Sequence, residues 1–411
     1  MSWKSARIIR PVVVTVAVQL LLALATALIK LHSGSDDTDI YYRYATMAMA
    51  GEVPYRDYRV EYPPLALLLF LVPGLIVPNI AGFKFAFAVE MLAFNAATVW
   101  AVAAWVERRE GPARVWSRLA WYTVFFVFLA RLMVARYDAV PMLLGFVAST
   151  WWFSGRSVLG GLAASLGALT KVYPAVVAVL ASTWDLTRPG SARGRGLVAF
   201  SLASTLGATA WLALGGFAGV SQSLGYQLGR GFEYGSLYSG AQMLAAKLVG
   251  AEIVIARDHA AWSSITPWSQ HLSALVFPTQ LVAILTVCLV FQRRGMTEGV
   301  RYTGAAILAF VVTSKVFSPQ YLIWLIPFIA ILEGPIARRG CWLFAAGCAA
   351  TLLAPATTNL FPRTSAWVIL AYNLKNVLFL ALLGLLTFGP GLLGQDKSQP
   401  GPAASAPGAA I

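Results

Sequence analysis

Charge is the first thing that this sequence lacks. Asp, Glu, Lys and Arg make up only 12% of its 411 residues, whereas a soluble globular domain carries about 25%. Hydrophobic residues account for 58% of the chain, and the mean hydropathy is +0.69. These values exclude a soluble protein. No polar stretch is long enough to stand apart as a soluble module, so we expect one membrane-embedded domain over residues 1–394.

Cysteine, histidine and nucleotide-binding motifs are also scarce. The cysteines lie in or at the ends of apolar stretches, without metal-ligand spacing, and are expected to be small core residues; they are Cys288, Cys341 and Cys348. The histidines are scattered and form no metal-binding set; they are His32, His259 and His271. No P-loop and no G-x-G-x-x-G motif opens a βαβ unit, so no nucleotide is expected. No internal repeat is visible, which gives an inverted-repeat transporter no support.

Long apolar segments are what the chain has in abundance. Runs of roughly 20 apolar residues, the length that crosses the hydrocarbon core of a bilayer, recur along it. They predict an all-α polytopic membrane protein with about 12 transmembrane helices. The helices are expected at 11–31, 81–106, 118–134, 138–153, 158–170, 173–185, 197–217, 271–291, 301–316, 320–333, 341–358 and 365–388.

Short basic connectors between these segments predict the topology. The positive-inside rule places them in the cytoplasm, together with both termini; they are 107–118, 154–157, 187–196, 292–301 and 337–340. The same bias accounts for the net charge of +14, and no basic motif or soluble platform predicts nucleic-acid binding. We therefore expect a multi-pass protein of the plasma (inner) membrane. Its Pro-, Ala- and Ser-rich tail at 395–411 is expected to be disordered in the cytoplasm.

Two apolar stretches depart from this pattern. The stretch at 63–78 has only 16 residues, four of them proline, so we expect an interfacial or re-entrant helix rather than a crossing. The stretch at 157–184 is interrupted at Lys171-Val-Tyr-Pro, which predicts two short helices that meet at Lys171 beside a cavity. The outward-facing loops are then 32–80, which is expected to carry short interfacial helices, and the longer loop 218–270.

Charged residues gather on the outward tips of this topology. A charge at the centre of a span costs about 2.5–3.5 kcal/mol, so such a residue usually faces a wet cavity and serves a function. If the tips converge, their cations form a positive pocket at the outer interface. The charged residues concerned are Asp36, Asp37, Asp39, Arg43, Glu52, Arg56, Asp57, Arg59, Glu61, Arg131, Arg136, Asp138, Lys171, Lys315 and Arg363.

A positive pocket beside a membrane suits a lipid-linked phosphate. A polyprenyl phosphate keeps its tail in the bilayer and its anionic head at the surface, where Arg and Lys can neutralise charge on a departing phosphate. A carboxylate of the first loop can act as the general base for an acceptor hydroxyl. Together these groups predict sugar transfer from a polyprenyl-phosphate sugar, outside the cytoplasm and without a nucleotide.

Five motifs in order along the chain resemble one family of membrane enzymes. They are TDIYYRYA, GEVPYRDYRVEYPPLA, RYDAVP, ALTKVYPA and SKVFSPQYLIWLIP, between residues 38 and 327. The sequence is similar to the GT-C superfamily of glycosyltransferases, and most similar to family 87, the polyprenol-phosphate-mannose-dependent α-mannosyltransferases of actinobacteria. The resemblance implies a membrane-embedded helical fold, a catalytic aspartate in the first outward loop, and an inverting single displacement. The family's loop aspartate falls on Asp39, with Asp36 and Asp37 close by.

Each candidate site residue has a functional and a structural interpretation. Asp39 is either the catalytic base or a first-turn acid that complements a helix dipole, with Thr38 as the N-cap of that helix. Glu61 either binds sugar hydroxyls or pairs with Arg59 or Arg56. Arg136 either binds the donor phosphate or pairs with Asp138 in a tight turn. These alternatives remain open at the level of the sequence.

The remaining candidates are assigned to donor or substrate. Lys171 and Lys315 are expected to bind the donor phosphate, unless they are lysines that snorkel to the interface, and Arg131 is a further phosphate ligand. Substrate-binding residues are expected to include Arg59, Glu61, Tyr62, Tyr173, Gln320 and Tyr321. Asp36, Asp37 and Asp39 could hold a divalent ion, but we expect no metal and no other cofactor.

The sequence therefore predicts an inverting glycosyltransferase. The expected donor is a polyprenyl-phosphate hexose, with mannose favoured, and the expected acceptor is a glycolipid or cell-envelope glycan at the outer face. One alternative keeps the chemistry and changes the sugar to arabinofuranose, glucose or galactose. The other is a lipid-linked sugar flippase or transporter, which would need a continuous polar path; the clustering of charge at one face favours the enzyme.

Overall fold

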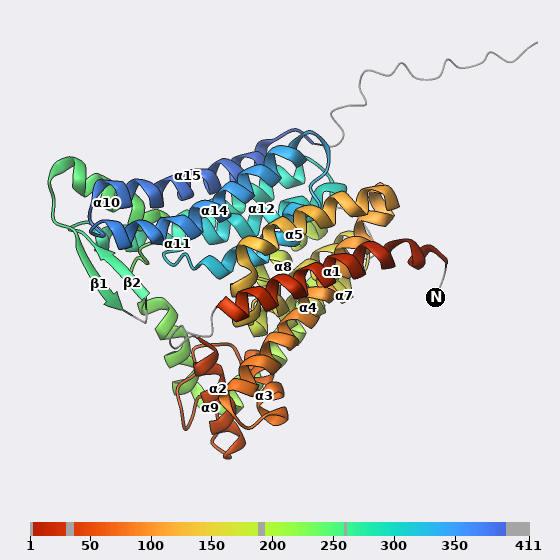
Figure 1. Ribbon diagram of the computed structural model, residues 1–411, viewed down its shortest axis with the longest axis horizontal. Helices are drawn as coiled ribbons and strands as arrows, with labels where there is room; N and C mark the ends of the chain where they lie inside the picture. Colours follow the sequence, from red (N-terminus) through yellow and green to blue (C-terminus); the bar gives the residue numbers. More distant parts are fainter. Residues whose placement is uncertain (1–2, 30–36, 188–193, 259–260, 392–411) are drawn as a thin grey trace, which may run out of the picture.

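The protein is a bundle of helices (Figure 1). The computed structural model describes residues 3–29, 37–187, 194–258 and 261–391. Among these residues seven helices are long and apolar enough to cross a membrane, which confirms the expected all-α polytopic membrane protein. They are α1 (Trp3–Ile29), α4 (Ile80–Glu110), α5 (Pro112–Ala135), α9 (Arg195–Gly229), α11 (Ser269–Gln292), α14 (Ala337–Leu360) and α15 (Ala366–Phe388).

Shorter elements fill the rest of the fold. The short α-helices are α2 (Asp37–Met49), α3 (Pro64–Ile76), α6 (Ala139–Phe153), α7 (Ser157–Thr170), α8 (Ala175–Thr187), α10 (Leu237–Val249), α12 (Gly299–Val312) and α13 (Ile326–Ala330). Three 3₁₀ segments are η1 (Met296–Glu298), η2 (Pro319–Leu325) and η3 (Gly334–Ile336). One antiparallel hairpin joins β1 (Val254–Asp258) to β2 (Ala261–Ile265), with Val254 opposite Ile265.

Each expected span contains a helix among the described residues, but only seven of the twelve expected crossings are long enough to cross a membrane. The span expected at 301–316 ends as a helix at Val312, and the span expected at 320–333 consists of η2 and the short α13.

Two further boundaries differ. Helix α9 was expected to end near 217 and instead continues to Gly229, bending at Gly216, whose φ of 61° and ψ of −177° suit glycine. The expected loop 218–270 therefore contains the end of α9, helix α10 and the hairpin. Helix α2 begins at Asp37, so the expectation that Thr38 is its N-cap is wrong.

The short helix α3 agrees with the interfacial or re-entrant segment expected at 63–78. It begins with Pro64 at the first helical position, where the missing N–H of proline costs nothing, and has 13 residues. Such a helix is about 20 Å long, which falls short of a hydrocarbon core of about 30 Å. Its Phe70 is fully buried and stacks on Tyr41 of α2, with ring centroids 4.2 Å apart. The first loop is thus a packed helical unit.

The helices pack closely where glycine allows it. α6 packs on α7, α7 on α9, α4 on α5, and α14 on α15. At the contact between α7 and α9, a Cβ at Gly161 would lie 2.1 Å from the carbonyl oxygen of Gly196, so only glycine permits this approach. Buried aromatic residues of α5, such as Tyr122, Phe125 and Phe126, fill the interior of the bundle.

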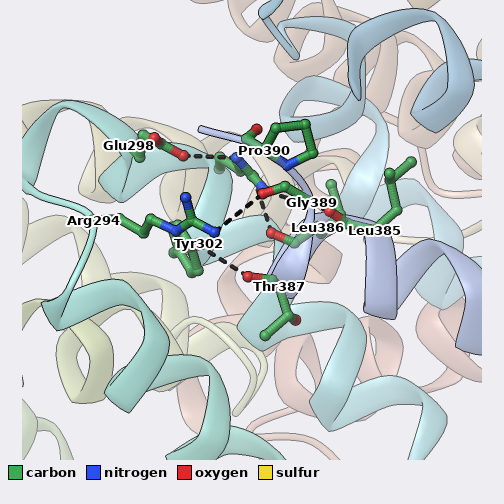
Figure 2. Close-up of polar contacts among 9 residues, drawn as sticks. Arg294, Glu298, Tyr302, Leu385, Leu386, Thr387, Gly389 and Pro390 are labelled. Carbon is green, nitrogen blue, oxygen red and sulfur yellow. Dashed lines mark hydrogen bonds and ion pairs between the residues drawn. The ribbon is translucent and has the colours of Figure 1, made fainter. Parts of the chain in front are cut away.

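One end of the bundle is closed by polar contacts at the C-terminus of α15 (Figure 2). Arg301 donates to the carbonyl oxygens of Leu386 at 2.9 Å and Gly389 at 2.9 Å, and pairs with Glu298 at 2.7 Å. Tyr302 donates to the Thr387 carbonyl at 3.0 Å. The last carbonyls of a helix have no partner within it and attract cations. These contacts therefore fix α15 against α12.

The two ends of the molecule differ in character (Figure 1). The start of α1, the turn between α4 and α5, and the end of α15 lie toward one end. Helices α2 and α3 lie at the opposite side of the bundle, and α10 with the hairpin occupies a second projection there. The basic connector 107–118 spans the turn between α4 and α5. The elements expected to face outward are thus separated from that connector.

Candidate functional site

The first turn of α2 carries two carboxylates that point to different cations. Tyr41, Tyr44 and Ala45 are buried, and their packing against α3 fixes the orientation of the helix. Residues two positions apart do not share a helix face, so Asp37 and Asp39 meet different partners. Asp37 pairs with Arg136, which follows the last residue of α5, and Asp39 pairs with Lys84 of α4 at 2.6 Å.

The expected pairing of Arg136 with Asp138 is wrong. Asp138 is fully buried and accepts instead from Lys171, at 2.7 Å, and from the indole N–H of Trp324. Arg136 has an extended backbone, while Asp138 is already in the right-handed helical region at the start of α6. This change of direction sends the two side chains to opposite sides of the turn. Among the described residues the second carboxylate oxygen of Asp138 has no hydrogen-bond partner.

Lys171 points inward, at the break between α7 and α8. It is the residue after α7 and has an extended backbone, and Pro174 lies just ahead of α8. Its ammonium lies 4.6 Å from the ring centroid of Tyr137, 5.2 Å from Trp324 and 5.5 Å from Tyr321. Cations this close to aromatic faces are attracted by them. Lys171 is therefore held by Asp138 and by an aromatic surround, and does not snorkel to a polar surface.

These groups form what we call the first-loop cluster. It contains Asp37, Asp39, Lys84, Arg136, Asp138 and Lys171. Its aromatic wall is continuous. Tyr173 stacks on Trp324 with centroids 3.9 Å apart, Tyr321 stacks on Trp324 at 4.4 Å, and Tyr62 meets Tyr137 edge-on at 5.2 Å.

A second charged group, the Glu233 cluster, lies between α9 and α10. It contains Arg230, Glu233, Lys315 and Lys375. The Glu233 N–H donates to the Lys315 carbonyl at 2.9 Å, and the carboxylate of Glu233 lies 3.8 Å from Arg230. Lys315 donates to the Leu228 carbonyl and Lys375 to the Gly235 carbonyl. The Lys375 ammonium also lies 3.4 Å from the Phe317 ring centroid.

Burial shifts the protonation of the Glu233 cluster. Loss of solvent raises the pKa of Glu233 to about 7, against the opposing effects of Arg230, Lys375 and the Phe317 backbone. Burial, assisted by Arg230, lowers the pKa of Lys315 below its ordinary value. A carboxyl group that changes charge near neutral pH is characteristic of functional sites.

Tyr321 connects the two clusters. Its phenol is within electrostatic range of Glu233 and Arg230 on one side and of Asp138 and Arg136 on the other. Cations from the α5–α6 turn, from the α7–α8 break and from the end of α9 thus act on one tyrosine. The sequence predicts that Asp39, Lys171 and Lys315 share one site; the structure places Asp39 and Lys171 in the first-loop cluster and Lys315 in the Glu233 cluster.

The other residues predicted from the sequence are not members of the two clusters. The backbone carbonyl of Glu61 accepts from Gln227 of α9 at 3.2 Å. Arg56 forms its ion pair with Asp57 at 2.9 Å. Gln320 accepts from the Ser318 hydroxyl. Exposed positions are occupied by Arg59 and Arg131. Outside the described residues lie His32, Asp36, His259 and the tail 395–411.

Four charged residues of the two clusters were missed from the sequence, namely Lys84, Arg230, Glu233 and Lys375, and so was Trp324 of the aromatic wall. Lys84 and Lys375 lie inside expected spans, and the rule that an ionisable residue in a span has a function could have identified both. Trp324 and Glu233 carry no such signal, because only the tertiary fold places them beside Asp138 and Lys375. Among the described residues no group of three His, Cys, Asp or Glu side chains could hold a metal ion.

Solved structures to which this chain is similar include two of the same protein. ArnT from Cupriavidus metallidurans, bound to undecaprenyl phosphate, superimposes with a TM-score of 0.50 at 15% sequence identity, over 92% of this chain and 77% of that chain. The apo state of the same protein gives a TM-score of 0.47 at 16% identity, with the same coverage. No protein-family model and no curated protein matches the sequence. The likeness to the undecaprenyl phosphate complex shows the fold, which is of the GT-C type.

Proposed function

We propose that the chain is a GT-C glycosyltransferase that takes a sugar from a polyprenyl-phosphate donor. The observation that carries this proposal is that the α2 carboxylates pair with cations of α4 and of the α5–α6 turn, and that Arg136 of this turn interacts electrostatically with Lys171, which pairs with Asp138. A carboxylate can remove the proton of an acceptor hydroxyl, and nearby cations can stabilise a departing phosphate. The fold likeness to a protein crystallised with undecaprenyl phosphate supports a lipid-linked donor.

In the proposed reaction Asp39 is the base. The acceptor oxygen attacks the anomeric carbon from the side opposite the phosphate, and its proton passes to Asp39. The carbon–oxygen bond to the phosphate breaks, and its electron pair leaves on the polyprenyl phosphate. Lys84, which pairs with Asp39 at 2.6 Å, orients this carboxylate. The product has the inverted anomeric configuration.

The sugar and the acceptor follow from the resemblance of the sequence motifs. We propose a hexose, with mannose as the first sugar to test, followed by arabinofuranose, glucose and galactose. The acceptor would be a glycolipid or cell-envelope glycan hydroxyl that enters from the outer face of the plasma membrane. The aromatic wall of Tyr62, Tyr173 and Tyr321, with Arg59, Glu61 and Gln320, is proposed to contact these substrates.

The test is transfer by the purified protein. Labelled polyprenyl-phosphate mannose and candidate acceptors are incubated with wild type, Asp39→Asn and Asp37→Asn, and with Asp57→Asn as a control from an exposed ion pair of the same loop. Loss of a general base typically costs 10²–10⁴-fold in rate, so Asp39→Asn should lose at least about 100-fold while Asp57→Asn keeps its activity. Undiminished transfer by folded Asp39→Asn protein would remove Asp39 as the base.

A further inference from the structure

Each cation of the first-loop cluster pairs with a carboxylate of the same cluster in the described part of the chain. Asp37 neutralises Arg136, Asp39 neutralises Lys84, and Asp138 neutralises Lys171. An anion that binds here must displace a carboxylate from one of these pairs before it can form an ion pair of its own. The first-loop cluster therefore offers a departing phosphate less uncompensated charge than unmatched cations would, although its cations can still orient the phosphate and partly stabilise it.

Charges in the Glu233 cluster are not matched. Two cations, Arg230 and Lys375, act on the single carboxylate of Glu233, and a third, Lys315, interacts electrostatically with Arg230. In the described part of the chain, Glu233 is the only carboxylate that pairs with any of the three. Lys315 and Lys375 direct their ammonium groups to backbone carbonyls instead. The cluster thus carries surplus positive charge.

A buried excess of positive charge is unfavourable unless a bound anion neutralises it. Lys375 is 2% exposed and lies inside α15. The side chains of Arg230 and Glu233 are each 17% exposed, and one buried carboxylate oxygen of Glu233 has no hydrogen-bond partner among the described residues. Buried charges in proteins are paired or bind a ligand. An unmatched cation inside a membrane helix is, by the same argument, a functional feature.

We propose that Arg230, Lys315 and Lys375 form the binding site for a phosphate monoester. This deepens the proposed function, and rests on it for the identity of the ligand, which would be the phosphate of the departing polyprenyl phosphate. Lys171, by contrast, is a positioning residue that holds Asp138 and the aromatic wall.

The charge of the cluster suits the leaving group better than the donor. A sugar-phosphate-polyprenyl diester has one negative charge, whereas the released monoester carries about −1.5 to −2 at pH 7. Surplus positive charge therefore stabilises the state in which the sugar has left. Interactions that strengthen as the reaction proceeds are the ones that accelerate it.

Glu233 acts in this site as a competing anion. Its carboxylate lies 3.8 Å from Arg230 and interacts electrostatically with Lys375. Both Glu233 and Arg230 also interact electrostatically with the phenol of Tyr321. When ionised it occupies the cations that the phosphate needs, and when protonated it frees them. Binding of the monoester is accordingly coupled to proton uptake by Glu233.

The test measures binding of farnesyl phosphate to the purified full chain by titration calorimetry. Farnesol and inorganic phosphate are titrated in parallel, to separate recognition of the lipid from recognition of the phosphate. A lost charge-assisted hydrogen bond costs about 1.5–3 kcal/mol, so Lys375→Met and Arg230→Gln should each weaken farnesyl phosphate binding at least about tenfold. Lys375→Arg keeps the charge and should bind within about threefold of wild type. Lys247→Gln, at an exposed position on α10, is the matched control.

The variant Glu233→Gln should change how farnesyl phosphate affinity depends on pH, which a purely structural role of Glu233 would not do. Because it removes the competing carboxylate, it should tighten farnesyl phosphate binding at pH 8, where Glu233 is ionised, and have little effect at pH 6. Equal affinity for farnesol, or unchanged affinity in folded Lys375→Met and Arg230→Gln, overturns the site. Binding of inorganic phosphate without farnesyl phosphate overturns the lipid headgroup as its ligand. If wild type binds farnesyl phosphate as described but transfers no sugar, the proposed function fails and this site stands.

Discussion

At the scale of single residues, Asp138 links the α7–α8 break to η2. Its carboxylate receives Lys171 from the α7–α8 break and Trp324 from η2. The side chain of Asp138 is 1% exposed and that of Lys171 is 17% exposed, so water solvates neither charge well. A buried pair of this kind contributes little net stability, but removing one partner leaves an uncompensated charge.

Asp138→Asn should therefore destabilise the protein by about 3–5 kcal/mol. The exposed pair Arg56–Asp57 offers a control, since its side chains are 63% and 35% exposed, and Asp57→Asn should cost no more than about 1 kcal/mol. Both changes are measured by reversible unfolding in detergent. The double variant Asp138→Asn with Lys171→Met should recover part of the loss. Equal effects of Asp138→Asn and Asp57→Asn would contradict the pairing described.

Glu233 should make stability depend on pH. Its carboxyl has a pKa of about 7 when folded, against 4.5 for the free side chain, so between these values the folded state binds the extra proton. Stability should then fall as pH rises from about 4.5 to about 7, by at most about 1.4 kcal/mol per pH unit for one proton. Glu233→Gln should flatten this dependence in unfolding measurements. A slope of the opposite sign, or the same slope in the variant, would exclude a raised pKa.

At the scale of elements, α9 connects the first loop to the Glu233 cluster. Gln227 near its end donates to the Glu61 carbonyl, and the Leu228 carbonyl accepts from Lys315. The helix reaches both because it bends at Gly216, where the φ of 61° is accessible only at a cost to other residues. The bend therefore sets the distance between the first loop and the Glu233 cluster.

Gly216→Ala should cost about 1–3 kcal/mol of stability and reduce sugar transfer, because the strained backbone favours a straighter helix. Gly225→Ala lies on the same helix, where an added Cβ meets nothing within 4 Å, and should change stability by less than about 1 kcal/mol. Unfolding and transfer are measured for both variants. If Gly216→Ala behaves like Gly225→Ala, the bend has no structural role.

The elements were largely predictable, whereas the partners of the charged residues were not. Apolar periodicity and the Lys171-Val-Tyr-Pro interruption predict the short helices α7 and α8, because these signals are local. Arg136 shows the limit, since its neighbour Asp138 was the obvious partner and the actual one, Asp37, is about a hundred residues away. Apart from Lys315, the members of the Glu233 cluster were missed for the same reason: only the fold brings Lys375 beside Gly235.

At the scale of the whole molecule, the two clusters lie on elements separated from the basic connectors. Figure 1 shows α2 and α10 away from the turn between α4 and α5. On the basis of the positive-inside rule we propose that the clusters face outward. A polyprenyl-phosphate substrate of the outer leaflet could then reach them from the bilayer.

This orientation can be tested by labelling. The three native cysteines are buried, so a membrane-impermeant maleimide should report only on introduced ones. Arg56→Cys in the first loop should be labelled in intact cells, whereas Arg338→Cys at the start of α14 should be labelled only after the membrane is permeabilised. The reverse pattern would place the candidate site in the cytoplasm.

Sugar transfer itself is the central claim, and its stoichiometry tests it most directly. Purified wild type in liposomes is given polyprenyl-phosphate mannose and acceptor, and all lipid products are quantified over time by mass spectrometry. We predict that glycosylated acceptor and free polyprenyl phosphate appear in equal amounts, and that neither appears with Asp39→Asn. Recovery of the intact donor in the opposite leaflet, with no polyprenyl phosphate released, would instead identify a flippase and contradict this account.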